Sequence, residues 1–340
     1  MNVIFSDNQR GHDPQWFLSS GAQVRNPELP ERASRLLTAA LESGLQLEAP
    51  EDYGDEVIAA IHSSRYLEFL QNIYPRWSRI EGASKEVIAN VHPIDRDDGY
   101  PESAVGQVGF HVYDTSCPIS VDTWHSARWS AMTATHAAKL VMSGESACYA
   151  LCRPPGHHSS QDLAGGFCYL NNSAIAAQQL LARYARVAII DVDVHHGNGT
   201  QRIFYERDDV LTVSVHTDPA SYYPFYWGYA NETGRAEGTG YNLNIPLALG
   251  SGDEAFLASL DEALQAVNVY SPDAVVIALG LDTHEDDPSR GMAITTPCFS
   301  RIGAKLATLA RPTVIVQEGG YLSDLLGRNL SSFLGGFQAA

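Results

Sequence analysis

Two carboxylates and an imidazole alternate with valines in one short stretch of the sequence. Asp191, Asp193 and His195 are separated by Val192 and Val194, directly after an apolar run. In an extended segment, alternate side chains point to the same face, so we expect these three polar groups to share one side. A carboxylate and an imidazole two positions apart can then bind one cation together.

A further metal ligand, Asp282, stands at the end of another apolar run. Three protein ligands with one open position are typical of catalytic zinc sites, whereas structural zinc sites are closed by four. Two carboxylates and one imidazole neutralise a divalent ion, and they also suit Fe²⁺ or Co²⁺. Asp193, His195 and Asp282 therefore predict a catalytic metal centre for Zn²⁺, with Fe²⁺ or Co²⁺ as alternatives.

Residues of these types also serve as ordinary caps and turns at strand ends, and an isolated Asp-x-His pair is weak evidence for a metal. The combination is more specific. A tandem pair, His157 and His158, follows one apolar run, and Tyr321 follows another. Imidazoles are suited to general acid–base catalysis near neutral pH. Together these positions indicate an enzyme more strongly than any single motif does.

The polar groups come directly after short runs of β-branched and apolar residues, which are Ala147–Leu151, Val187–Ile190, Val210–Val215, Ala274–Leu279 and Thr313–Val316. Continuously apolar strands of this length are typical of a parallel sheet covered by helices on both faces. Helical patterns over Ser173–Ala185 and Asp253–Val267 predict the crossovers. Open parallel sheets bind ligands at the carboxyl ends of their strands, so we expect the polar groups to meet at that edge.

Composition excludes several classes of protein. Of 340 residues, 22 are Lys or Arg and 40 are Asp or Glu, which gives a net charge of −18, and 44% are hydrophobic. Such a chain can bury a large core, but it repels nucleic acid and anionic membranes. No apolar run approaches the roughly 18 residues of a membrane span, and Met1–Asp13 is too polar for a signal peptide. Five scattered cysteines without a CxxC pair indicate reduced thiols, so we expect a cytoplasmic protein.

Four motifs together resemble those of the histone deacetylase superfamily and, within it, the bacterial acetylpolyamine amidohydrolases. They are Arg153–His158 (RPPGHH), Gly165–Asn172 (GGFCYLNN), Asp191–Gly199 (DVDVHHGNG) and Glu318–Tyr321 (EGGY). Their order and spacing match over nearly the whole chain. The resemblance implies a three-layer αβα arginase/deacetylase-like α/β fold with a central, mainly parallel sheet of about eight strands. It also implies one catalytic metal and hydrolysis of an acetylated primary amine.

The resemblance assigns the metal ligands to Asp193, His195 and Asp282, and it assigns acid–base roles to the histidine pair. His158 would deprotonate the attacking water and then protonate the leaving amine, alone or with His157.

In the family pattern, His157 pairs with Asp191, and His158 pairs with the residue at 198. That residue is Asn198 here, whereas eukaryotic members carry Asp. We hypothesise that the neutral amide raises the pKa of His158 less than a carboxylate would, which suits a base near neutrality.

Three further roles follow from the resemblance. Tyr321 would donate its hydroxyl to the developing oxyanion. Phe167 and Tyr223 would line a narrow channel to the metal, and an aromatic slot of this kind fits an extended alkyl chain. The carbonyl of Gly166 would accept the amide N–H of the substrate.

Two monovalent-cation sites, usually for potassium, are also implied by the family. The inner site would use Asp191, Asp193, His195, Ser214 and the carbonyl of Val215. The outer site would use backbone carbonyls around Phe204, Arg207, Val210 and Tyr241. Carbonyl ligands leave no side-chain pattern, so these residues rest on the resemblance alone.

The chain has no internal repeat, low-complexity tract or linker, so we predict a single catalytic domain over residues 1–340. An aromatic-rich insertion around 74–135 is similar to one that forms the dimer interface and narrows the entrance in acetylpolyamine enzymes. We therefore expect a homodimer or a dimer-based oligomer, and a small cationic acylated amine as substrate. Neutral Val105 and Ser116 stand where one family member has carboxylates, although Glu102 and Asp114 are nearby and could substitute, so the preferred amine stays open.

Three other functions are compatible with parts of this pattern. A protein or small-molecule acetyllysine deacetylase would use the same site. An arginase-like enzyme with two manganese ions needs extra carboxylates where Gly197 and Gly280 stand. A non-catalytic binding protein on the same fold would not need the full set of catalytic side chains that this sequence carries.

Overall fold

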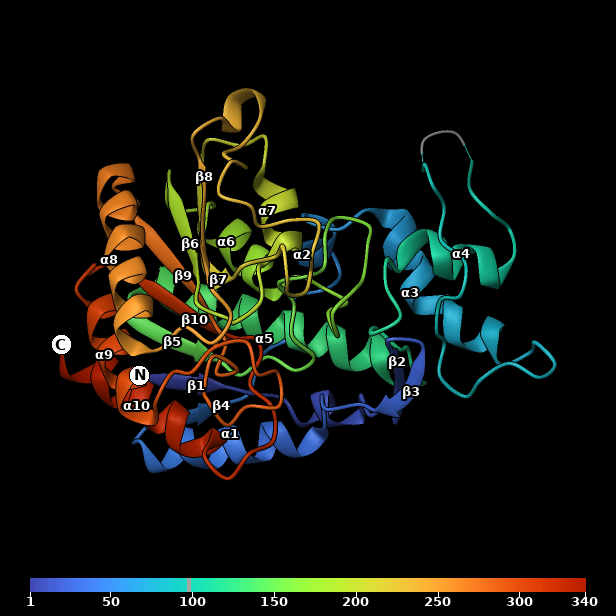
Figure 1. Ribbon diagram of the computed structural model, residues 1–340, viewed down its shortest axis with the longest axis horizontal. Helices are drawn as coiled ribbons and strands as arrows, with labels where there is room; N and C mark the ends of the chain where they lie inside the picture. Colours follow the sequence, from blue (N-terminus) through green and yellow to red (C-terminus); the bar gives the residue numbers. More distant parts are fainter. Residues whose placement is uncertain (97–98) are drawn as a thin grey trace.

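The computed structural model describes residues 1–96 and 99–340 and contains an eight-stranded sheet of order β4-β1-β5-β10-β9-β6-β7-β8 (Figure 1). The neighbouring strands of this sheet pair in parallel. The strands are β1 (Asn2–Ile4), β4 (Gln46–Glu48), β5 (Ala147–Ala150), β6 (Val187–Asp191), β7 (Val210–Thr217), β8 (Asn242–Leu247), β9 (Ala274–Leu279) and β10 (Thr313–Gln317). A separate antiparallel hairpin joins β2 (Trp16–Ser19) to β3 (Ala22–Arg25).

Helices cover both faces of the sheet. One hydrophobic cluster includes residues of α2 (Glu56–Ala59), α3 (Ser64–Trp77), α4 (Ala104–His111), α5 (Thr123–Ser143), α6 (Asn172–Leu180) and α7 (Asn198–Phe204). The cluster on the opposite face includes α1 (Pro30–Glu42), α8 (Asp253–Tyr270), α9 (Thr296–Ala307) and α10 (Leu326–Ala339). Two short 3₁₀ helices are η1 (Asp7–Gly11) and η2 (Ala236–Gly238). The predicted three-layer αβα fold with a parallel sheet of eight strands is confirmed.

The strand sequences explain this layering. In β6, Ile189 packs into the first cluster, whereas Ala188 and Ile190 pack into the second. Both faces of the central strands are therefore buried, as their continuous apolar runs predict. Burial of each Val or Ile side chain stabilises the fold by about 1.5–3 kcal/mol relative to exposure. The sheet therefore holds the loops at its edge in fixed positions.

Two predicted helices differ in length from the observed ones. The helix predicted over Ser173–Ala185 ends at Leu180 and is followed by a turn, in which the N–H groups of Ala182 and Arg183 donate to carbonyls three positions earlier. The N–H groups of Ala185 and Arg186 then donate to the Asp273 carboxylate, each at 3.0 Å. The helix predicted over Asp253–Val267 continues to Tyr270. It ends there because the backbone of Ser271 is in the left-handed conformation.

Three strands of the sheet, β1, β4 and β8, and the β2–β3 hairpin were not predicted. β1 and β4 have three residues each, which is too short for a period to show. β8 carries Asn242, Asn244 and Pro246, which weaken its apolar pattern.

The segment 74–135 includes α4 and extends to one side of the sheet, at the right of Figure 1. Positions 97–98 of this insertion lie outside the described residues. Val91 and Ile94 of the insertion are 59% and 99% exposed. Its role in a dimer, and the single-domain organisation of 1–340, stay predictions. Among the described residues, no helix is both long and apolar enough to span a membrane.

Candidate active site

The three predicted metal ligands meet at the carboxyl edge of the sheet, beyond β6 and β9. His195 Nδ1 lies 3.1 Å from Asp193 Oδ1 and 3.3 Å from Asp282 Oδ2. One ligand atom from each residue lies within 4.8 Å of the other two. The two carboxylates are fully buried, while the His195 side chain is 15% exposed. We call these three residues the metal cluster.

The chain reaches this geometry by turning and does not continue as a strand. β6 ends at Asp191, whose Oδ1 accepts the N–H of Asp193 at 3.0 Å. Asp193 Oδ1 in turn accepts the N–H of His195 at 2.9 Å. Such side-chain-to-backbone bonds are typical of Asx turns. The prediction that three alternating side chains line one extended segment is therefore wrong beyond Asp191.

The metal cluster fits a divalent cation. In the described part of the chain, the buried Asp282 Oδ2 has no hydrogen-bond partner. Burial and the nearby Asp193 raise the pKa of Asp282 to about 7, as expected for two carboxylates that share a buried site without a cation. A Cβ atom at Gly319 would collide with Asp282 Oδ2, and one at Gly280 would collide with Asp193 Oδ2. Both glycines therefore keep the carboxylates free to face a cation, and neither can supply a second set of ligands.

The histidine pair has the predicted partners. His157 Nδ1 lies 2.9 Å from Asp191 Oδ2, and His158 Nδ1 lies 2.7 Å from Asn198 Oδ1. The two imidazole centroids are 4.0 Å apart. Because Nδ1 of each ring is bonded to an oxygen, each Nε2 is left available for chemistry.

The two imidazoles differ in electrostatics. Burial alone would lower the pKa of His157, but Asp191 and Asp193 raise it well above its ordinary value. Burial lowers the pKa of His158 well below the ordinary value, and His157 and His195 add to that effect. The surroundings thus favour the protonated form of His157 and the neutral form of His158, and a neutral ring is the one able to accept a proton.

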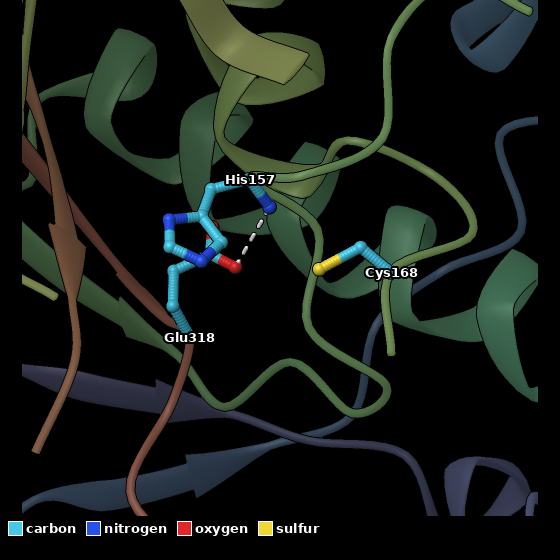
Figure 2. Close-up of side chains that lie close together, drawn as sticks. All are labelled: His157, Cys168 and Glu318. Carbon is cyan, nitrogen blue, oxygen red and sulfur yellow. Dashed lines mark hydrogen bonds between the residues drawn. The ribbon is translucent and has the colours of Figure 1, made fainter. Parts of the chain in front are cut away.

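A second group of metal-binding residue types lies next to this pair (Figure 2). Ligand atoms of His157, Cys168 and Glu318 all lie within 4.8 Å of one another, and all three residues are buried. We call this group the anchor cluster. Glu318 Oε2 accepts the backbone N–H groups of Gly156 at 2.6 Å and of His157 at 3.0 Å. Its Oε1 accepts the hydroxyl of Ser173 at 2.7 Å.

These bonds identify the anchor cluster as a support for the histidine turn. Both oxygens of Glu318 are used, and burial raises the pKa of the Cys168 thiol well above its ordinary value. A thiol binds metal as the thiolate, so this cysteine is a poor ligand. Its Sγ donates to the carbonyl of Gly166 at 3.3 Å. This carbonyl, predicted to bind the substrate amide, keeps a second lone pair for that bond.

Tyr321 is held beside the metal cluster by groups that no sequence motif indicates. Its backbone N–H donates to Asp287 Oδ2 at 2.8 Å. The guanidinium of Arg32, from α1, lies 5.0 Å from the centroid of its ring. Arg32 also donates to the carbonyls of Glu318 at 2.8 Å and Gly320 at 2.5 Å. A fully buried arginine such as Arg32 is unusual, but its burial cannot be recognised from a single sequence.

A cavity of about 540 Å³ leads from the metal cluster to the surface. Its walls bring together the predicted residues His158, Gly166, Phe167, His195, Tyr223 and Tyr321. Tyr113 and Asp114, from the insertion expected to narrow the entrance, also line it. The Tyr223 hydroxyl donates to Asp114 Oδ2 at 2.6 Å, and the Gly166 N–H donates to the same oxygen at 2.9 Å.

The predicted potassium ligands lie at the end of β6 and just after it, on β7, at the end of α7, and on the segments next to α7 and β8. Asp191 and Ser214 are register partners on these strands, and both line a small cavity of about 10 Å³. At the outer group, the Phe204 carbonyl accepts the N–H of Arg207, and the Tyr241 carbonyl accepts that of Thr212. Potassium at either place stays a prediction.

Comparisons with known proteins agree with this geometry. The family model described as histone deacetylase domain matches residues 26–337. Acetylpolyamine amidohydrolase of Burkholderia pseudomallei (strain 1710b) is 46% identical over 100% of this chain and 99% of its own length. Acetylpolyamine amidohydrolase 1 of Pseudomonas aeruginosa (strain PAO1) is 42% identical with the same coverage. A crystal structure of acetylpolyamine aminohydrolase from Burkholderia pseudomallei covers 100% of this chain and 99% of its own, with 46% identity and a TM-score of 0.97. The chain therefore belongs to the histone deacetylase family, and acetylpolyamine amidohydrolases are among its full-length relatives.

Proposed function

We propose that this protein is a metal-dependent deacetylase that hydrolyses N-acetylated diamines and polyamines to the free amine and acetate. One observation carries the proposal: His195 of the metal cluster, His158 and Tyr321 line one cavity with aromatic walls. The full-length relatives named acetylpolyamine amidohydrolase support the substrate class.

Zn²⁺ is our first choice for the ion held by Asp193, His195 and Asp282, with Fe²⁺ or Co²⁺ as alternatives. When bound there, such an ion polarises the amide carbonyl and lowers the pKa of a water molecule. We also propose structural K⁺ at the two predicted sites.

The chain's own residues supply the rest of the reaction. His158, whose Nδ1 is bonded to Asn198, accepts the proton of the attacking water at Nε2. It then passes this proton to the nitrogen of the leaving amine, and the C–N bond breaks, so the amine departs neutral. The acetic acid that forms keeps the oxygen and the second proton of water, and it releases that proton to solvent or to the amine to become acetate. The Tyr321 hydroxyl donates to the substrate carbonyl oxygen as negative charge develops there. Phe167 and Tyr223 orient the alkyl chain and exclude bulk water.

Assembly and location are also proposals. The exposed apolar residues of the 74–135 insertion support a homodimer, or an oligomer built from dimers. The five cysteines are free and buried, which supports a cytoplasmic protein. The net charge of −18 supports a small cationic substrate, with neither nucleic acid nor membrane as a partner.

Turnover of acetylputrescine, acetylcadaverine and acetylspermidine, compared with acetyllysine peptides, tests the function on metal-loaded protein. We expect higher kcat/KM for the acetylated amines. Preference for the peptides would replace the proposal with a lysine deacetylase, and no turnover of any acylated amine would refute it. Chelation followed by addition of Zn²⁺, Fe²⁺ or Co²⁺ then identifies the ion that restores activity.

A further inference from the structure

Aromatic side chains surround the outer part of the cavity. We call this group the aromatic mouth, and it consists of Phe17, Tyr113, Tyr223, Phe225, Tyr226 and Trp227. Phe17 comes from β2, Tyr113 follows α4, and the others lie on the loop after β7. The rings contact one another edge to face, with centroids 5.8 Å apart for Tyr113 and Trp227 and 5.9 Å apart for Tyr226 and Trp227.

Exposure increases along the cavity, which sets the direction in which a substrate must lie. Tyr321 is 6% exposed beside the metal cluster, whereas Phe225 and Tyr226 are 49% and 78% exposed. An acetyl group that reaches the metal cluster therefore leaves the other end of a slender amine among the outer rings. At neutral pH that end is an ammonium group.

The carboxylate nearest to this position is already in use. Among the described residues that line the cavity, Asp114 is the one acid and there is no Lys or Arg. Asp114 Oδ2 accepts the Tyr223 hydroxyl and the Gly166 N–H, and its Oδ1 accepts the N–H of Ser116 at 2.9 Å. Three of about four acceptor positions are thus occupied by the cavity wall itself. Asp114 therefore acts mainly as a support for Gly166 and Tyr223.

We propose that the aromatic mouth binds the distal ammonium group of the substrate through cation–π interactions, with Phe225 and Tyr226 as the outermost rings. Aromatic faces attract organic cations by their quadrupole and do not need a hydrogen-bond donor on the ligand. The ligand class is then an N-acetylated amine with a cationic far end, primary or quaternary. This inference rests on the proposed deacetylase function and names the feature of the substrate that the enzyme selects.

Three substrates with the same acetamide separate the possibilities. Acetylcadaverine carries a primary ammonium, its N,N,N-trimethyl derivative carries a cation without N–H donors, and N-hexylacetamide is the neutral counterpart. For the wild-type holoenzyme we expect both cationic compounds to exceed N-hexylacetamide in kcat/KM by about 2-fold to 30-fold, the range that cation–π contacts provide.

Variants locate the effect. Phe225→Leu and Tyr226→Leu are expected to remove most of the cationic preference, seen as the ratio of kcat/KM values between acetylcadaverine and N-hexylacetamide. Tyr226→Phe keeps the ring without its hydroxyl and is expected to keep the ratio. Circular dichroism of each variant checks that the fold is intact.

Each other outcome has a clear meaning. If acetylcadaverine exceeded N-hexylacetamide in kcat/KM but the trimethyl compound did not, a carboxylate would be binding the primary ammonium through its N–H groups. That result would overturn the inference. Equal turnover of N-hexylacetamide and acetylcadaverine, or an unchanged ratio in both leucine variants, would also overturn it. All of these leave the deacetylase proposal intact, whereas an enzyme inert on all three compounds and on longer acetylated amines would refute that proposal itself.

Discussion

The metal cluster and the anchor cluster contain similar residue types at similar spacing, yet their hydrogen bonding differs. Both are buried at the carboxyl edge of the sheet, with ligand atoms within 4.8 Å. Asp282 keeps a buried oxygen without a partner in the described chain, whereas Glu318 gives both oxygens to the protein. Close ligand atoms alone therefore do not identify a metal site. What separates the two clusters is one buried carboxylate oxygen without a hydrogen bond, Asp282 Oδ2, beside His195 at the wall of the cavity.

The largest effect is expected from Asp282→Asn in the metal cluster. The amide keeps the shape of the side chain but removes the negative charge that holds the cation, so we expect bound metal near zero and no measurable turnover. Metal analysis and activity assays on the same sample test this. Asp286→Asn, at an exposed acid on the same loop, is the matched control and should keep both. Full metal content in Asp282→Asn would contradict the assignment.

Tyr321→Phe tests the part of the site that is independent of metal binding. Loss of one oxyanion donor typically lowers kcat by about 10²-fold to 10³-fold. We expect that loss with metal content unchanged, because Tyr321 is outside the metal cluster. Steady-state kinetics with metal analysis measure both quantities. A variant that retains most of its kcat would remove Tyr321 from the mechanism.

Glu318→Gln tests whether the anchor cluster supports the histidine turn without binding metal. The amide keeps one acceptor oxygen, but its NH₂ group replaces the other, and the negative charge beside His157 is lost, so the turn that carries His157 is held less firmly. By analogy with other outer partners of a catalytic site, we expect kcat to fall by about 10-fold to 100-fold. The content of divalent metal should stay at one ion per chain. If Glu318→Gln instead lost the ion, the anchor cluster would be part of the metal site.

The stability of the same variant should depend on pH differently from that of the wild type. Burial raises the pKa of Glu318 from about 4.5 to about 7, against the opposing effect of His157. Between these values the unfolded chain has lost a proton that the folded chain keeps, so wild-type stability falls as pH rises through this range. The glutamine side chain of the variant cannot titrate. Urea unfolding at pH 5 and pH 8 should therefore show a smaller difference in the free energy of unfolding between wild type and variant at pH 8 than at pH 5. A constant difference would mean that Glu318 is ionised throughout.

Sequence patterns predicted the parts of this molecule whose cause is local. The central strands are apolar on both faces, so β5, β6, β7, β9 and β10 were identifiable within two residues at each end. Asp193, His195 and Asp282 were identifiable because ligand types follow such strands. Asx turns after Asp191 replaced the predicted extended segment, since a side chain can bond its own backbone as readily as a strand can continue.

Groups that act through long-range contacts were not predictable. Arg32 meets the carbonyl of Glu318 across 286 positions of sequence, and Asp114 meets Tyr223 across 109. Neither residue stands in one of the four motifs. The sequence offers Asp114 only as a possible substitute for a rim carboxylate, and it gives no sign that Asp114 bonds Tyr223 or that Arg32 is buried. Their roles follow from burial and from the partners that the tertiary fold supplies.

The smallest effect is expected from Cys168→Ala in the anchor cluster. The thiol has a raised pKa because it is buried, and its weak bond to the Gly166 carbonyl is one of several supports for that loop. We expect unchanged metal content and a loss of stability of about 1 kcal/mol, the usual scale for a single substitution. Metal titration with thermal unfolding tests both. If the wild type bound a second ion that Cys168→Ala did not, hydrogen-bond saturation would be a poor criterion, and the two clusters would have to be regarded as two metal sites.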